Sequence, residues 1–489
     1  MHPTRTLIVD LPGPDLGAED ARQLKRLGAG GVCLFARNVT TPDRTARLIR
    51  DLRDALGHDA LVGVDQEGGA VLRRLDVPLP PTPQALGVLD DPRAAHRAGQ
   101  IAARGLIELG INWNFAPSLD VNVDPLNPVI GERSFGTDPE RVAALGTAWA
   151  QGSEAAGVLG CVKHFPGHGD TRVDSHLDLP VVRKAPAELE RTEWPPFQAA
   201  VRAGVGSLMT AHILYPALDP EAPATLSGPV LSGLLRGQWG YDGVVVTDDV
   251  GMRAIADRHP AFSAAPLALQ AGADAVLVCG HGDPGAHEQA ARALDLALSR
   301  AALTEARVAQ ALARLSRAAA RFPGTPRPYL PGQWDADEQD VAWMAEASLT
   351  WTAAPLTLDP GREVLLLAPD TAPLGGPYGD ALSGEALAAA LRAHLPRLHR
   401  VSLHDESGVR QALRDPDVPV LLATTGRWAV PEDTRRTAAL LGGRRAPVLH
   451  LALWSAQAAV DLALPAVITH GFRPANLNAL GRALSGVRA

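Results

Sequence analysis

The chain contains the stretch Gly160-Cys161-Val162-Lys163-His164-Phe165-Pro166-Gly167-His168-Gly169-Asp170-Thr171, which continues to Asp174-Ser175-His176. Its first five residues predict a short buried strand, and the residues after them combine histidines, carboxylates and turn formers. Such crowded polar groups are costly to bury, so they usually line a site rather than a core. The stretch therefore predicts a strand with functional side chains just beyond its carboxyl end.

Similar strand-forming runs recur throughout the first 320 residues. Short apolar runs rich in β-branched residues predict seven more strands, at residues 7–11, 32–35, 61–65, 114–121, 208–213, 244–248 and 275–279. Segments of helical pattern and length, such as residues 41–56 and 92–109, lie between most of them. Eight strands that alternate with helices over roughly 300 residues are typical of a TIM-like (β/α)8 barrel rather than an open sheet.

Polar residues stand at the carboxyl ends of five of these predicted strands. They are Asp65, Asp120, Lys163, His164, His212 and Asp248. Barrel enzymes carry their catalytic residues at this end of the strands, so the repeated position predicts one shared site. For His212, a place in the site and a place at the edge of the core are equally compatible with the sequence.

A second α/β region follows a proline-rich linker. Residues 323–331 contain four prolines, which cannot continue a helix, and a helical stretch at about residues 335–347 comes next. Strand-like runs then recur at residues 364–367, 400–403, 418–423, 448–453 and 466–469. We therefore expect a TIM-barrel catalytic domain at residues 1–322, a linker and helix at 323–347, and a smaller doubly wound α/β sandwich domain at 348–489.

Composition and charge exclude several classes of protein. The 489 residues are 46% hydrophobic and 20% charged, which is typical of a globular enzyme, and the net charge of −8 argues against nucleic acid or an anionic membrane as the partner. No apolar run approaches the roughly 18 residues of a membrane helix, and the first ten residues lack a signal-peptide pattern, so we expect a cytoplasmic protein. The three cysteines, Cys33, Cys161 and Cys279, predict no disulfide framework. The sequence does not indicate an oligomeric state.

The run from Lys163 to His176 resembles, almost without a break, the signature of the glycoside hydrolase family 3 β-N-acetylglucosaminidases, the NagZ-like branch that trims cell-wall sugars. A second motif, Val244-Val245-Val246-Thr247-Asp248-Asp249-Val250-Gly251-Met252, resembles the nucleophile signature of the same family. From the residues alone, either aspartate could be a nucleophile, or both could bind a metal ion. The resemblance implies that Asp248 is the nucleophile and Asp249 its neighbour.

The resemblance also implies roles for residues in other motifs. His176 would be the general acid and base, oriented by Asp174, where most retaining glycosidases use a second carboxylate. The loop Val64-Asp65-Gln66-Glu67-Gly68-Gly69 and the segment Ile130-Gly131-Glu132-Arg133-Ser134-Phe135-Gly136 match further family motifs. By these matches the substrate-binding residues are Asp65, Arg73, Arg133, Lys163 and His164. The chain departs from many relatives at Ala70, where they carry another arginine, so the contacts around this loop stay open.

Some of these assignments have a structural alternative. Arg133 could form a structural ion pair, and His176 could cap a loop. His168 and Asp170, inside the main motif, are expected to organise the loop through hydrogen bonds.

The resemblance implies a retaining exo-β-N-acetylglucosaminidase that removes terminal N-acetylglucosamine from peptidoglycan fragments or related glycosides through a glycosyl-enzyme intermediate. Its partner would be a small-molecule glycoside or a muropeptide, and it would require no metal or organic cofactor. Three alternatives remain. The first is a phosphorylase that acts on β-N-acetylglucosaminides or β-glucosides through the same intermediate. The others are a non-catalytic sugar-binding protein and a metal-dependent hydrolase that uses His164, His168, Asp170 and His176.

Overall fold

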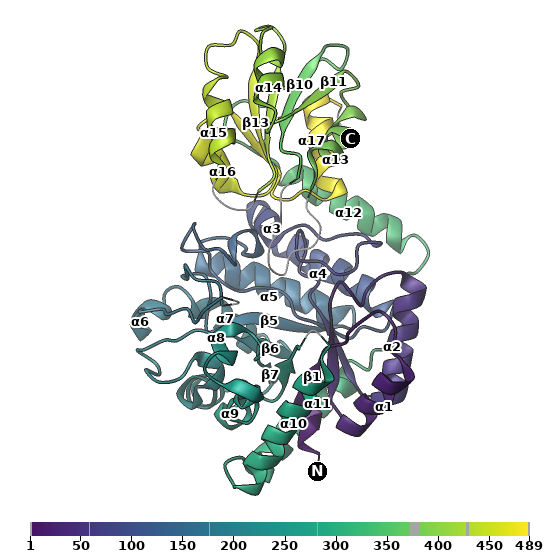
Figure 1. The fold of residues 1–489 in the computed structure, drawn as a ribbon, viewed down its shortest axis with the longest axis vertical. Coiled ribbons are helices and arrows are strands. Elements are labelled where there is room, and N and C mark those ends of the chain that lie inside the picture. Colours follow the sequence, from purple (N-terminus) through teal and green to yellow (C-terminus); the bar gives the residue numbers. More distant parts are fainter. Residues whose placement is uncertain are drawn as a thin grey trace.

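The computed structural model describes residues 2–57, 59–175, 177–280, 282–371, 382–426 and 430–487. Eight parallel strands form a closed barrel in the first part of the chain (Figure 1). They are β1 (Leu7–Val9), β2 (Gly31–Leu34), β3 (Leu61–Val64), β4 (Trp113–Asn114), β5 (Leu159–Phe165), β6 (Ser207–Thr210), β7 (Val244–Val246) and β8 (Val276–Val278). β1 pairs with both β2 and β8, and a parallel bridge between Val246 and Ala275 joins β7 to β8. The closed ring confirms the predicted TIM-like (β/α)8 barrel.

Helices surround the barrel, and several begin at an aspartate that precedes a proline. Asp91, Asp138 and Asp283 each accept a hydrogen bond from a backbone N–H in the first turn of the helix that follows. The helices of this part are α1 (Ala18–Leu27), α2 (Pro42–Leu56), α3 (Pro83–Leu89), α4 (Pro92–Ile107), α5 (Pro139–Ala155), α6 (Pro186–Leu189), α7 (Trp194–Arg202), α8 (Arg253–Ala256), α9 (Ala264–Ala271), α10 (Pro284–Ser299) and α11 (Glu305–Arg321), with further helical segments η1 (Pro3–Thr6), η2 (Gly131–Arg133), η3 (Ala224–Leu226), η4 (Pro229–Gln238) and η5 (Pro260–Phe262).

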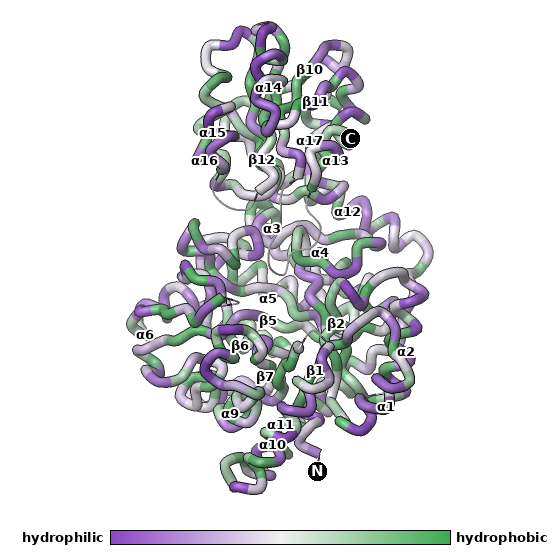
Figure 2. The backbone as a smooth tube through the Cα atoms, viewed as in Figure 1, coloured by the Kyte–Doolittle hydropathy of each residue, from purple (hydrophilic) through white to green (hydrophobic). Residues whose placement is uncertain are grey.

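The strands alternate their side chains between two apolar clusters. Leu7 and Val9 belong to a large cluster shared with the surrounding helices, whereas Ile8 belongs to a second cluster with Trp113 and Phe115. This alternation fills the barrel with side chains and leaves the carboxyl ends of the strands for polar groups. Figure 2 shows hydrophobic residues along the strands and a mixture of hydrophobic and hydrophilic residues along the outer helices.

The fourth predicted strand was too long. Only Trp113–Asn114 forms β4, and residues 115–121 leave the regular ladder although they stay buried. The side chain of Asn114 bonds the backbone of Gln66 on both its N–H and its carbonyl, and Pro117 has no N–H to donate to a neighbouring strand. The segment still follows β5 irregularly, because the backbone N–H of Leu119 donates to the carbonyl of Lys163.

A second sheet of six strands forms the C-terminal part, with the order β11-β10-β12-β13-β14-β9. Its parallel strands are β10 (Val364–Ala368), β11 (Leu398–Ser402), β12 (Val420–Thr424), β13 (Val448–Ala452) and β14 (Ala466–Ile468), and β9 (Thr350–Trp351) pairs antiparallel with β14. The helices are α12 (Gln333–Ala347), α13 (Gly384–Arg392), α14 (Glu406–Ala412), α15 (Glu432–Ala439), α16 (Ala456–Leu462) and α17 (Pro474–Ser485).

Helices cover both faces of this sheet. Leu387 of α13 and Leu480 of α17 pack with Leu366 of β10, whereas Val409 of α14 packs with Leu365 and Leu367 on the other face. The predicted doubly wound α/β arrangement is confirmed, and the antiparallel β9 is an addition that the sequence did not reveal. The sheet lies above α3 and α4 of the barrel part (Figure 1). Within the described ranges, no helix is both long and apolar enough to cross a membrane.

Candidate active site

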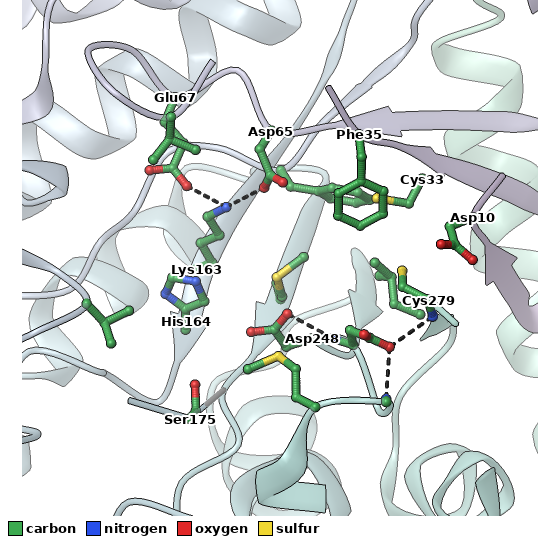
Figure 3. A pocket seen from close by; sticks show the side chains of 18 of the residues that line it. Asp10, Cys33, Phe35, Asp65, Glu67, Lys163, His164, Ser175, Asp248 and Cys279 are labelled. Atoms are coloured by element: carbon green, nitrogen blue, oxygen red, sulfur yellow. Dashed lines mark hydrogen bonds and ion pairs between the residues drawn. The ribbon is translucent and has the colours of Figure 1, made fainter. Parts of the chain in front are cut away.

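A cavity of about 650 Å³ opens at the carboxyl ends of the barrel strands (Figure 3). Its lining includes the predicted nucleophile and all five predicted substrate-binding residues: Asp65, Arg73, Arg133, Lys163, His164 and Asp248. Asp65 follows β3, Lys163 and His164 belong to β5, and Asp248 follows β7. The structure therefore brings these six residues into one cavity. Of the six residues that the strand-end pattern predicts to share a site, Asp65, Lys163, His164 and Asp248 line this cavity, whereas Asp120 and His212 are not in its lining.

Lys163 lies at the centre of a buried cluster of charges. Its Nζ is 2.9 Å from Oδ1 of Asp65 and 2.7 Å from Oε1 of Glu67. Arg133 holds both carboxylate oxygens of Glu67, at 2.7 and 2.8 Å, and Arg73 reaches Asp65 at 3.2 Å. Figure 3 shows the Lys163 ammonium between the carboxylates of Asp65 and Glu67. The cluster is held in place by its own members before any ligand enters.

Glu67 is a member of this cluster that the sequence analysis did not assign. Its side chain is only 1% exposed and links Arg133 to Lys163. Arg133 therefore combines the two interpretations considered for it, because it forms an ion pair and also lines the cavity. A signal for Glu67 was present: it stands two residues after Asp65, where an extended chain turns its side chain to the same face.

Glu67 and Lys163 stay charged at neutral pH. Burial alone would raise the pKa of Glu67, but the adjacent Arg133 and Lys163 outweigh it and hold the pKa well below its usual range. Burial alone would lower the pKa of Lys163, and the carboxylates of Asp65 and Glu67 outweigh it and raise the pKa. Lys163 is therefore a permanent hydrogen-bond donor at the base of the cavity.

Asp120 holds the carboxyl end of β5 through hydrogen bonds to His164 and His168. It is fully buried and accepts hydrogen bonds from Nδ1 of His164 at 2.7 Å, from the backbone N–H of His168 at 2.6 Å and from the hydroxyl of Ser118 at 2.8 Å. Burial would raise its pKa, but His164 and these donors outweigh burial and lower the pKa to about 2. Because Asp120 accepts from Nδ1, the other ring nitrogen of His164 is the one available to a ligand.

The loop after β5 is held by its own histidine and aspartate, as predicted. Nδ1 of His168 bonds the hydroxyl of Thr171 at 2.8 Å, its Nε2 bonds the hydroxyl of Ser175 at 3.3 Å, and Asp170 pairs with Lys184 at 3.0 Å. These contacts bring Ser175 into the lining of the cavity.

The approach of this loop to the barrel also requires a glycine. A Cβ on Gly169 would lie 1.6 Å from the carbonyl oxygen of Val121, so no larger residue fits without displacement. Tyr215 holds the preceding turn, because its hydroxyl donates to the carbonyl of Gly167.

The proposed acid and its partner lie at the end of this loop. His176 falls outside the described residues, so its place relative to the cavity stays a prediction. Asp174 is half-buried, and its carbonyl accepts a hydrogen bond from the backbone N–H of Leu177 at 2.8 Å. Ser175, between the two, lines the cavity.

The adjacent carboxylates Asp248 and Asp249 have different surroundings. One oxygen of Asp249 accepts the backbone N–H groups of Gly251 and Cys279, both at 2.9 Å, so this side chain closes the turn after β7. Burial, with a contribution from the nearby charge of Asp248, raises the pKa of Asp249 to about 7. Asp248 lies across the cavity from Lys163 and His164 (Figure 3), and its Oδ1 accepts the backbone N–H of Asp249 at 2.8 Å. Both carboxylates line the cavity, and that of Asp249 is the one committed to the turn.

His212 belongs to the edge of the core. It is 1% exposed, and its Nδ1 bonds the hydroxyl of Thr225 at 2.8 Å. Its Nε2 donates to the carbonyl of Asp249 at 2.8 Å and so supports the turn that carries the two aspartates.

Protein partners engage three of the four residues considered for a metal site, and the fourth, His176, lies outside the described residues. His164 is bound to Asp120, His168 to Thr171, and Asp170 to Lys184. In the part of the chain that the structure describes, no group of three or more His, Cys, Asp or Glu side chains is arranged to hold a metal ion.

Comparisons with known proteins point to one family. The family model described as the glycosyl hydrolase family 3 N-terminal domain matches residues 8–318. A β-hexosaminidase of Thiobacillus denitrificans is 38% identical over 283 residues, which are 56% of this chain and 78% of that protein.

Two solved structures extend this similarity. A family 3 β-N-acetylglucosaminidase from Paenibacillus sp. FPU-7 is 32% identical with a TM-score of 0.90, and the match covers 100% of this chain and 96% of that one. NagZ from Neisseria gonorrhoeae, solved with N-trifluoroacetyl-D-glucosamine, is 29% identical with a TM-score of 0.58, and the match covers 70% of this chain and 98% of that one. The first of these structures therefore has a counterpart of both sheets.

The neutral state of His168 makes stability depend on pH. Burial, together with the neighbouring His164, lowers the pKa of His168 to about 4, whereas an unfolded histidine has a pKa of about 6.5. The unfolded chain therefore takes up this proton first, and the stabilisation is present above pH 6.5 and lost as the pH falls toward 4. We expect His168→Gln to remove up to about 3 kcal/mol of the pH dependence of the unfolding free energy in this range.

Denaturant unfolding at several pH values measures this dependence. His399→Gln, at an exposed histidine of β11, is the control and should keep the wild-type slope. The buried His450 and His470, whose pKa values burial also lowers to about 4, contribute equally to all three proteins. If the slope of the unfolding free energy against pH is the same in His168→Gln as in the wild type, His168 is not a source of this pH dependence.

Proposed function

Because the chain belongs to glycosyl hydrolase family 3, we propose that it is a retaining exo-β-N-acetylglucosaminidase that uses Asp248 as its nucleophile. The observation that carries this proposal is the position of the Asp248 carboxylate opposite the Asp65–Lys163 pair in the cavity. A terminal sugar needs a nucleophile on one side and fixed partners for its hydroxyls on the other, and this cavity supplies both.

The charged cluster orients the sugar. The carboxylate of Asp65 accepts hydrogen bonds from hydroxyl groups, and Lys163, Arg73 and Arg133 donate to hydroxyl oxygens. His164 adds a ring nitrogen, since Asp120 occupies the other one. Groups that are already paired with one another lose little freedom when the sugar binds, so they favour one orientation of the anomeric carbon.

The reaction then has two steps. In the first, a carboxylate oxygen of Asp248 attacks the anomeric carbon, the glycosidic bond breaks, and His176 donates a proton to the leaving oxygen. In the second, His176 takes a proton from water, which attacks the same carbon and releases Asp248 as a carboxylate. Asp174 would orient the ring of His176. Two displacements at one carbon retain its configuration.

The natural substrate we propose is a muropeptide or another peptidoglycan fragment with a terminal N-acetylglucosamine, processed in the cytoplasm. The resemblance to the NagZ-like branch supports this choice. We assign the chemistry to residues 1–322, joined through residues 323–347 to a supporting domain at residues 348–489.

A chromogenic assay tests the activity. The protein should release nitrophenol from p-nitrophenyl β-N-acetylglucosaminide much faster than from the corresponding β-glucoside, and added phosphate should leave the product as free N-acetylglucosamine. Formation of the sugar 1-phosphate would instead identify a phosphorylase. Failure to turn over either glycoside, with sugar binding intact, would leave a binding protein.

Substitution of the two aspartates tests the nucleophile. Asp248→Asn keeps the shape of the side chain but removes the attacking charge, so turnover should fall by several orders of magnitude while N-acetylglucosamine still binds. Asp249→Asn is the matched control, since its carboxyl group serves the turn, and it should retain far more activity. The reverse order of damage would show that the nucleophile is Asp249.

The leaving group tests the acid. His176→Ala should slow glycosides with poor leaving groups by roughly 10² to 10⁴-fold more than activated aryl glycosides, because only the former need protonation. Asp174→Ala should show the same selectivity more weakly. Equal losses on both kinds of substrate, measured as kcat/KM, would remove His176 from this role.

A further inference from the structure

The carboxyl edge of the C-terminal sheet contacts the barrel loop that carries the charged cluster. After β14, Arg473 donates a hydrogen bond from Nε to the carbonyl of Gly69 at 2.7 Å. The neighbouring Ala70 is 3% exposed and belongs to the same apolar cluster as Trp454 and Phe472 of the C-terminal part. The tip of the barrel loop is thus packed as part of the C-terminal domain.

The residues on either side of this tip form the sugar-binding wall of the cavity. Asp65 and Glu67 precede it, Arg73 follows it, and all three line the cavity. The backbone N–H of Glu67 donates to the carbonyl of Val71 at 2.9 Å, which closes the loop into a narrow turn. A shift at the tip therefore moves both arms and the charges on them.

The tip has little room to adopt another conformation. Gly68 and Gly69 have positive φ angles of 120° and 58°. A Cβ on Gly68 would lie 2.3 Å from the carbonyl oxygen of Pro81, and one on Gly69 would lie 2.1 Å from the side chain of Thr82. The loop is clamped between residues 80–82 on one side and Arg473 on the other.

A second contact holds residues 80–84 to the same edge of the sheet. The hydroxyl of Thr82 donates to the carbonyl of His470 at 2.6 Å, and Nδ1 of His470 bonds the side chain of Gln84 at 3.1 Å. The C-terminal segment 470–473 therefore contacts both the tip of the loop and residues 82–84 beside it.

We propose that Arg473 is a positioning residue for the sugar site: through Gly69 it sets the placement of Asp65, Glu67 and Arg73, and the C-terminal domain thereby completes the binding wall of the barrel. This inference rests on the proposed function, because it assigns the wall to sugar recognition. Arg473 is suited to the role, since its guanidinium also lies over the ring of Phe472, 5.2 Å from the centroid, which fixes its direction.

The effect should appear in binding rather than in the chemical step. Asp248 follows β7, on a different part of the barrel from the loop after β3. Loss of wall contacts that serve substrate and transition state alike raises KM and leaves kcat nearly unchanged.

The experiment compares Arg473→Met with Arg473→Lys in the full chain. Methionine keeps an apolar stem over Phe472 but cannot donate, whereas lysine keeps a donor and the charge. We expect Arg473→Met to raise KM for p-nitrophenyl β-N-acetylglucosaminide, and Kd for N-acetylglucosamine, roughly tenfold, which is the effect of losing about one hydrogen bond between the displaced wall and the sugar. Arg473→Lys should recover most of the loss.

A matched control separates positioning from general stability. Arg482 belongs to α17, the helix that Arg473 precedes, and pairs with Glu346 of α12 at 2.8 Å, away from the cavity. Arg482→Met should lower the melting temperature about as much as Arg473→Met does, but it should leave KM unchanged. Equal KM values in the two methionine variants, or a loss in kcat alone, would overturn the proposal.

Hydrogen exchange of residues 66–74 provides a readout that does not depend on catalysis. Arg473→Met should exchange faster than wild type in this segment, and Arg482→Met should not. Unchanged exchange in Arg473→Met would overturn the positioning role even if the wild-type protein proves active. If Arg473→Met exchanges faster in residues 66–74 but the wild-type protein has no glycosidase activity, the positioning role of Arg473 stands and the proposed function is rejected.

Discussion

The buried ammonium of Lys163 determines where the other charged side chains of the site must lie. An isolated charge of this kind in the interior would cost several kcal/mol, so Asp65 and Glu67 must lie beside it. Two carboxylates for one cation leave one excess negative charge, and Arg73 and Arg133 supply two positive charges beside them. Satisfying one charge thus fixes the relative positions of β3, β5 and the loop after β4.

Much of this arrangement could be predicted from the sequence, and the failures have physical causes. The barrel was predictable because buried parallel strands are continuous apolar runs, and the site because polar residues such as Asp65 and Asp248 end those runs. β4 was misjudged because residues 115–121 are all buried and still bond β3 and β5, although too irregularly to extend the ladder. β9 has two residues, too few for any periodic pattern.

Within the site, the contacts that each side chain makes were harder to predict than the residues that belong to the site. Glu67 and Asp120 bind other protein groups, and nothing in a single sequence says whether a carboxylate faces a sugar or a cation. Asp248 and Asp249 are chemically identical neighbours, and in the structure the backbone N–H groups of Gly251 and Cys279 bind Asp249. The sequence was equally compatible with His212 in the cavity or at the edge of the core. Its hydrogen bonds to Thr225 and to the carbonyl of Asp249 place it at the edge of the core.

The pairing of β1 with β8 has a consequence for how the chain acquires its pocket during synthesis. On the ribosome, Asp65, Lys163 and Asp248 all emerge before Val278, the last residue of the strand that closes the ring. Until β8 pairs with β1, the sheet has two open edges and the cavity at its carboxyl end is not enclosed. Because Leu277, Cys279 and Gly280 also line the cavity, the pocket is complete only after the last strand has joined the first.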